Sequence, residues 1–109
     1  MRALRTGVKT SKYRAVKTNG YASKKEAKRA AELKLLEKAG KITFLGEQVK
    51  YEIVPAQKGE RAAHYVADFQ YLLPSRGLVI EDVKGVRTRE YILKRKLMLY
   101  VHGIRITEV

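Results

Sequence analysis

The sequence predicts an α/β domain with a central mixed sheet flanked by helices, and three observations support this fold class. Residues 23–39 and 88–102 have the composition and end signals of helices. Residues 48–84 contain three strand-like segments separated by turn signals. Apolar residues recur from Ile104 to Val109, after the second helix. A strand that follows a strand–helix unit normally pairs in parallel, so the order helix, three antiparallel strands, helix, strand predicts a mixed sheet.

The first helix is predicted from its two ends. Ser23 and Glu26 form a capping box, in which the serine hydroxyl accepts a hydrogen bond from the backbone three residues later. The segment that follows is rich in good helix formers. Gly40 suits the position just after a helix, so we expect the helix to run to about Ala39.

Three strands are predicted at residues 48–54, 64–72 and 78–84. The first has apolar and charged residues in alternation, which is typical of a half-buried strand. The second helix is expected from Thr88, as its N-cap, to about His102. Gly103 should end it, and a short last strand should follow.

The turn between the second and third strands predicts a strand register. Residues 73–77, LPSRG, are typical of a hairpin turn. If the hairpin is centred near Ser75, facing residues have numbers that sum to about 150, because the turn sets the register. Asp68 should therefore face Asp82, to within about two residues.

The composition favours a polyanionic partner. The chain has 24 Lys and Arg against 11 Asp and Glu, a net charge of +13. Such a charge favours nucleic acid, because binding phosphates releases counterions. A membrane surface is less favoured, since the basic residues are spread along the chain. No apolar run approaches the ~20 residues that span a bilayer. There is no cysteine, so disulfides and thiolate metal sites are excluded, and we expect a cytoplasmic protein.

The domain organisation follows from charge and length. Residues 1–20 contain six Lys or Arg and no acid, and they predict a basic N-terminal arm. Residues 21–109 have the length of one compact domain. We see no internal repeat and no linker within them.

Three charged residues are candidates for chemistry. Asp82 and Lys84 lie two residues apart in a strand, so they project from the same face. Asp68 lies among apolar residues, where a carboxylate is unfavourable unless it is paired or bound to a metal. Two neighbouring carboxylates lower their repulsion by sharing a proton, a lysine or a divalent cation.

These residues allow two interpretations. Oxygen ligands without His or Cys favour Mg²⁺, with Mn²⁺ as a substitute. A metal beside Lys84, on a strongly basic protein, points to phosphodiester hydrolysis. Alternatively, Asp68, Asp82 and Lys84 form a structural salt-bridge cluster. Spacing and charge alone leave both open. His64 and His102 have no ligand-like spacing, and no phosphate-binding glycine motif is present.

Basic residues before and on the second helix are candidates for nucleic-acid contacts. Such side chains position a phosphate backbone more often than they read bases. The candidates are Arg87, Lys94, Arg95 and Lys96.

The ordered set of motifs resembles the PD-(D/E)XK nuclease superfamily, which has the restriction-endonuclease-like fold. The set comprises Glu26 on a helix, Asp68 on a strand, Asp82-Val83-Lys84 on the next strand, and a basic helix. More closely, SKKEAKRAAELKLLEKAGKI, YVADFQY, VIEDVKG and YILKRKL are similar to small phage- and prophage-encoded proteins related to Holliday junction resolvases. The similarity covers nearly the whole domain. Ala67 stands where the superfamily motif has its proline.

The resemblance implies roles for individual residues. Glu26, Asp68, Asp82 and Lys84 would be the catalytic residues. The carboxylates of Glu26, Asp68 and Asp82, with the Val83 carbonyl, would bind Mg²⁺. The core would be restriction-endonuclease-like, with the order helix-β-β-β-helix-β.

The expected function is therefore a Mg²⁺-dependent endodeoxyribonuclease. The resemblance implies a Holliday junction resolvase that cuts four-way DNA junctions as a homodimer. One alternative is a non-catalytic basic protein that binds nucleic acid. Another is a nuclease of the same superfamily that acts on linear or nicked DNA.

Overall fold

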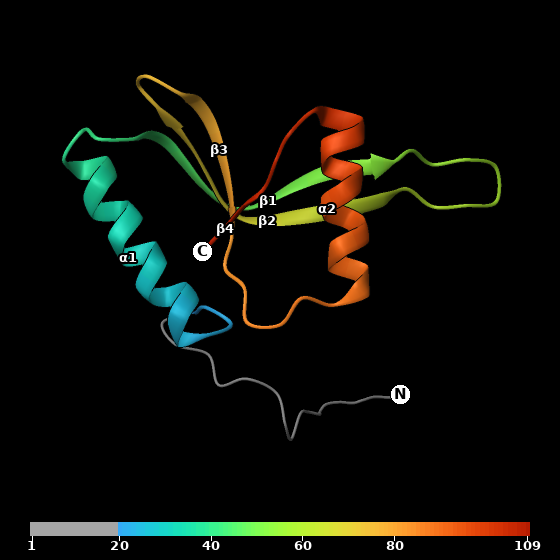
Figure 1. The fold of residues 1–109 in the computed structure, drawn as a ribbon, viewed down its shortest axis with the longest axis horizontal. Helices are drawn as coiled ribbons and strands as arrows, with labels where there is room; N and C mark the ends of the chain where they lie inside the picture. The colour runs from blue at the N-terminus through green and yellow to red at the C-terminus, as the bar shows by residue number, and fades with distance from the viewer. Residues whose placement is uncertain (1–19) are drawn as a thin grey trace.

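The computed structural model describes residues 20–109, which form a four-stranded open sheet with two helices (Figure 1). The predicted α/β class is confirmed. The basic arm predicted at residues 1–20 lies outside the described residues, except for Gly20. In chain order the elements are α1 (Lys24–Lys38), β1 (Thr43–Val54), β2 (Ala63–Leu73), β3 (Gly77–Asp82), α2 (Arg89–His102) and β4 (Thr107–Glu108). No helix within residues 20–109 is long and apolar enough to cross a membrane.

The sheet is mixed, as predicted, with the order β1-β2-β3-β4. The pairs β1–β2 and β2–β3 are antiparallel, and β4 joins β3 in parallel after α2. Two further backbone hydrogen bonds extend this last pairing. The Lys84 N–H donates to the Val109 carbonyl at 3.1 Å, and the Val109 N–H donates to the Asp82 carbonyl at 3.0 Å. The C-terminal residues therefore hold the segment that leaves β3.

The hairpin of β2 and β3 has the predicted register. Phe69 pairs with Glu81, and Leu73 pairs with Gly77 at the turn. The same register places Asp68 beside Asp82. The third strand is shorter than predicted, because β3 ends at Asp82. Lys84 thus lies in the segment after the strand.

Both helices begin and end as the sequence predicts. The Ser23 hydroxyl accepts from the Glu26 N–H at 3.1 Å, and the Thr88 hydroxyl accepts from the Tyr91 N–H at the same distance. Gly103 ends α2 in the left-handed conformation, with φ 68°. Glycine adopts this conformation without the steric penalty of a Cβ.

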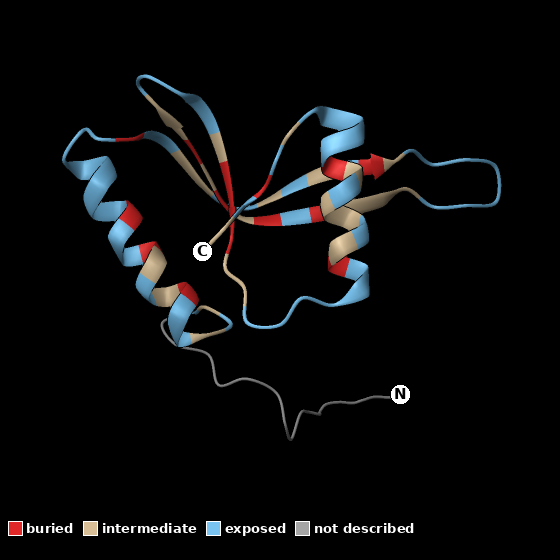
Figure 2. Ribbon diagram, in the orientation of Figure 1, coloured by how far each residue is buried: buried red, intermediate tan, exposed pale blue. Residues whose placement is uncertain are grey.

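The two helices bury different parts of the sheet (Figures 1 and 2). Figure 2 shows buried residues on both helices and along the strands between them. The α1 cluster consists of Ala30, Leu33, Ile42, Phe69 and Tyr71. The α2 cluster consists of Ile53, Tyr65, Ala67, Ile80, Tyr91, Met98 and Ile106. Since β2 contributes buried residues to both clusters, both helices pack against it.

Strand β1 is longer than predicted and irregular in its first half. It begins at Thr43, five residues before the predicted start. Its pairing with β2 shifts register between Thr43 and Gly46. Phe44 and Gln48 both have positive φ, 55° and 52°. This conformation is uncommon for residues other than glycine, so the alternation that predicts a strand is lost before Val49.

Candidate active site

One hollow contains all the residues that the sequence predicts for catalysis. Glu26 from α1, Asp68 from β2 and Asp82 from β3 line it, together with Val83 and Lys84. We call it the carboxylate cavity. Its volume is about 520 Å³. Three chain segments that are far apart in the sequence therefore place their acidic side chains around one space.

Asp82 is the most buried of the aspartates and has two partners. Its side chain is 8% exposed. One carboxylate oxygen accepts from the Tyr65 hydroxyl at 2.6 Å. The other lies 3.0 Å from the Lys84 ammonium. The predicted pair of Asp82 and Lys84 is thus formed, although Lys84 lies beyond the end of β3.

Asp68 is held beside Asp82 by the backbone. Its carboxylate accepts from the Val83 N–H at 2.8 Å. Burial raises the pKa of Asp68, the Val83 N–H lowers it, and the nearby carboxylates of Asp82 and Glu26 raise it, so that it lies at about 6. The repulsion among these carboxylates is also a source of cation affinity. A cation would relieve the repulsion that protonation relieves in its absence.

Glu26 lies near the N-terminus of α1, where it is only 7% exposed. Burial raises its pKa, and the charges of Asp82 and Glu47 add to the rise. The Gln48 amide contacts two carboxylates, donating to Glu26 at 3.0 Å and reaching Asp68 at 3.4 Å. Gln48 is thus a neighbour of the site that sequence reasoning missed. Its position depends on a left-handed backbone for which a glutamine gives no signal.

The donor set of the cavity suits a hard divalent cation. It is lined by the carboxylates of Glu26, Asp68, Asp82 and Glu90 and by no sulfur or imidazole ligand, which is the chemistry that Mg²⁺ prefers. As their side chains stand, no three acidic or histidine residues among the described residues converge on a common point. The Lys84 ammonium and the Gln48 amide instead occupy positions beside the carboxylates. The ligand types suit Mg²⁺, and the carboxylate side chains would have to change rotamer to bind one ion together.

Replacing Asp68 by asparagine should stabilise the metal-free protein at neutral pH. The raised pKa means that folding favours the protonated acid. This contribution is full below about pH 4 and is lost as the pH rises through about 6. At pH 7.5 in EDTA, the free energy of unfolding should rise by about 1 kcal/mol, because solvent screens the charge of this partly exposed carboxylate. Urea denaturation at pH 3.5 and 7.5 measures the difference, which should vanish at the lower pH.

A matched control for this variant is Glu52→Gln, which removes an exposed carboxylate from the same sheet. It should change stability little at either pH. Saturating Mg²⁺ should stabilise the wild type and leave Asp68→Asn almost unaffected. A variant that is less stable than wild type at pH 7.5 would show that the charge of Asp68 is compensated within the chain.

Lys84 rests on the ring of Tyr91, from the first turn of α2. Its ammonium lies 3.6 Å from the ring centroid, a cation–π contact. The Tyr91 hydroxyl donates to the Glu108 carboxylate at 2.7 Å. The Lys25 ammonium also donates to the Lys84 carbonyl at 2.8 Å. The predicted catalytic lysine is therefore held by both helices, and sequence reasoning missed the role of Tyr91.

Most of the predicted nucleic-acid contacts have acidic partners within the chain. Arg87 and Arg95 both bind Glu108, at 2.5 Å and 3.1 Å. Lys94 pairs with Glu90 at 3.2 Å and lines the carboxylate cavity. Arg87, Tyr91 and Arg95 together lower the pKa of Glu108 to about 2. These cations are thus placed around the site, and their contact with nucleic acid stays a prediction.

Glu81 lies next to Asp82 in the sequence but makes different contacts. It is 1% exposed and binds Arg29 of α1 through two hydrogen bonds, at 2.8 Å and 2.6 Å. The Tyr71 hydroxyl also donates to it. This buried ion pair fastens α1 to the sheet and so fixes Glu26 beside the strands. Glu81 is therefore a structural neighbour of the site.

Comparison with known proteins identifies a family. Residues 10–107 match the family model described as "Protein of unknown function (DUF1064)". No curated protein and no solved structure matches the chain. The matched region contains every residue of the carboxylate cavity. The chain belongs to the DUF1064 family.

Proposed function

We propose that this protein is a metal-dependent endodeoxyribonuclease with a restriction-endonuclease-like core. The observation that carries the proposal is the gathering of Glu26, Asp68, Asp82 and Lys84 around one cavity. A passive nucleic-acid binder has no need for buried carboxylates in a protein of net charge +13. A metal-dependent phosphodiesterase needs them, because they bind the cation that offsets the charge of the phosphate.

In this proposal Glu26, Asp68 and Asp82, with the Val83 carbonyl, hold Mg²⁺, for which Mn²⁺ substitutes. The bound metal would supply a polarised phosphate and a water molecule of lowered pKa. Lys84 is placed beside Asp82 by the Tyr91 ring, so its positive charge is available to the attacking oxygen or to the phosphate. When the metal binds, Asp68 and Asp82 would give up their contacts with Lys84 and neighbouring hydrogen-bond donors and would bind the metal instead.

We further propose that the substrate is branched DNA, in particular four-way junctions, and that the protein acts as a homodimer. The resemblance of the motif set to junction resolvases supports the substrate. The need for two symmetric cuts supports the dimer, since a two-fold axis relates two identical sites. The reaction would take place in the cytoplasm, that of the host cell if the protein is virus-encoded.

A cleavage assay tests the proposal. The purified protein is given a labelled four-way junction and a linear duplex of the same arm sequence, each with Mg²⁺ and with EDTA. We expect paired cuts in the junction only, and only with Mg²⁺. Equal cutting of both DNAs would keep the nuclease and reject the junction preference. Binding without cutting, in Mg²⁺ and in Mn²⁺, would reject the nuclease and favour a non-catalytic nucleic-acid-binding protein.

A further inference from the structure

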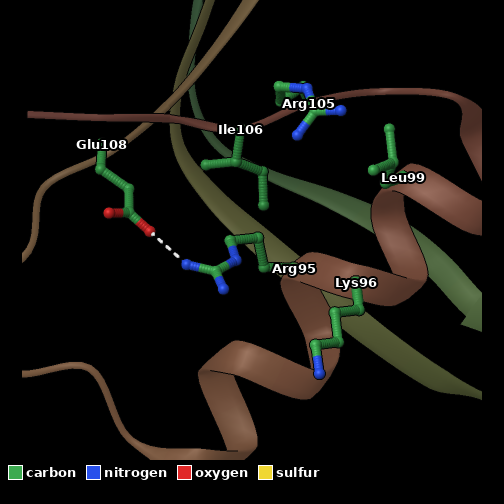
Figure 3. A pocket seen from close by; sticks show the side chains of 6 residues that line it. All are labelled: Arg95, Lys96, Leu99, Arg105, Ile106 and Glu108. Carbon is green, nitrogen blue, oxygen red and sulfur yellow. Dashed lines mark hydrogen bonds and ion pairs between the residues drawn. The ribbon is translucent and has the colours of Figure 1, made fainter.

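A second hollow lies on α2, apart from the carboxylate cavity (Figure 3). Its volume is about 390 Å³. Its lining consists of Arg95, Lys96, Leu99, Arg105, Ile106 and Glu108, and we call it the basic pocket. Figure 3 shows Arg95 reaching from α2 to Glu108, with Arg105 supplied by the segment before β4. None of these residues lines the carboxylate cavity.

The charges of the basic pocket favour an anion. Its lining contains three cations and one carboxylate. Glu108 is already bound by Arg87 and Arg95. Within residues 20–109, Lys96 and Arg105 have no acidic partner, and both are exposed. The side chains of Lys96 and Arg105 are therefore available to a ligand. Arg95 lies near them and is held by its ion pair with Glu108. Buried Ile106 forms part of the wall, so the cations stand on a rigid surface.

The basic pocket and the carboxylate cavity lie around the same helix, α2. Lys94 lines the cavity, whereas Arg95 and Lys96 line the pocket, as expected for successive positions that point in different directions around a helix. The two hollows meet at Tyr91, which lines the cavity and whose hydroxyl donates to Glu108 of the pocket at 2.7 Å.

We infer that the basic pocket binds a backbone phosphate of DNA, a different phosphate from the one in the carboxylate cavity. Lys96 and Arg105 contact the phosphate, and Arg95 adds its charge from its position on Glu108. This inference rests on the nucleic-acid ligand of the proposed function. It does not require cleavage. Such a contact fixes where the DNA lies and carries no base preference of its own.

The test compares two charge-matched double variants of the full chain. Lys96→Gln with Arg105→Gln removes the two available cations of the pocket. Lys58→Gln with Arg61→Gln removes two exposed cations from the loop between β1 and β2. Binding to a labelled duplex and to a four-way junction is measured in EDTA at several salt concentrations. The salt dependence counts the phosphate contacts that each variant has lost.

We expect the pocket variant to bind on the order of tenfold more weakly at moderate salt. Its slope of log K against log salt should fall in magnitude by about 1, because one phosphate contact is lost. The loop variant should keep the wild-type slope. Equal losses in both variants, or an unchanged slope in the pocket variant, would overturn the inference, as would a wild type that does not bind DNA.

The outcome is separable from that of the proposed function. If wild type cuts DNA with Mg²⁺ and the pocket variant binds like the loop variant, the pocket assignment fails and the nuclease stands. If the pocket variant loses its phosphate contact and wild type never cuts, the pocket stands as a nucleic-acid site and the nuclease fails.

Discussion

Replacing Asp82 by asparagine should lower the rate of DNA cleavage by roughly 10³-fold or more. Asp82 lies between the other functional groups. It contacts Lys84 through one oxygen and Tyr65 through the other, and it stands beside Asp68. Asparagine keeps the shape and removes the negative charge that a metal needs. DNA binding should be retained, because the change removes a charge that repels phosphate. Single-turnover cleavage with Mg²⁺ and binding in EDTA measure the two effects separately.

The control for this variant is Glu52→Gln, which removes an exposed carboxylate that does not line the cavity. It should cut DNA at a rate close to that of wild type. Cleavage by Asp82→Asn within tenfold of wild type would show that the metal is not bound there, and the salt-bridge interpretation of Asp82 and Lys84 would then be preferred.

Among the single substitutions considered, Glu81→Gln should lower the free energy of unfolding the most. Glu81 is almost fully buried, and glutamine cannot neutralise Arg29. Breaking a buried ion pair by removing one partner lowers stability by about 3–5 kcal/mol. The Arg29 side chain is 26% exposed and keeps its bond to Glu32, so we expect the lower part of that range, about 3 kcal/mol. Urea denaturation at pH 7.5 measures the free energy of unfolding.

A double variant separates the charge from the packing. Arg29→Met with Glu81→Leu removes both members of the pair and keeps apolar volume between α1 and the sheet. It should recover much of the stability that Glu81→Gln loses, because no unpaired charge remains buried. The two single variants, Arg29→Met and Glu81→Leu, complete the cycle. The double variant could also lose more stability than the two single variants lose in sum. That result would show that methionine and leucine form no apolar contact in place of the ion pair.

Local rules predicted the part of the site that depends on one hairpin. A short turn fixes its own register, so the neighbouring positions of Asp68 and Asp82 followed from residues 73–77 alone. The helix ends were also predicted, because Ser23, Thr88 and Gly103 cap the helices through contacts with residues nearby in the sequence. The position of Glu26 in the cavity was expected only from the resemblance, because it depends on how α1 packs against the sheet.

Contacts between distant segments account for what the sequence did not predict. Gln48 reaches Glu26 and Asp68 across a left-handed backbone position. Arg87 and Arg95 share Glu108, which is brought to them by the parallel pairing of β4. The alternation of a strand does not reveal that a charged residue such as Glu81 is buried with a helix arginine. Each of these contacts requires the packed fold.

The irregular first half of β1 has a consequence for the behaviour of the protein in solution. With the strand order β1-β2-β3-β4, β1 is an edge strand, and no strand within residues 20–109 pairs with its outer side. A long, flat margin of this kind would be a template for the addition of strands from other molecules. The left-handed turns at Phe44 and Gln48 bend the backbone out of the plane that such addition requires. We therefore expect the backbone distortion that brings Gln48 to the carboxylates to hinder edge-to-edge aggregation as well.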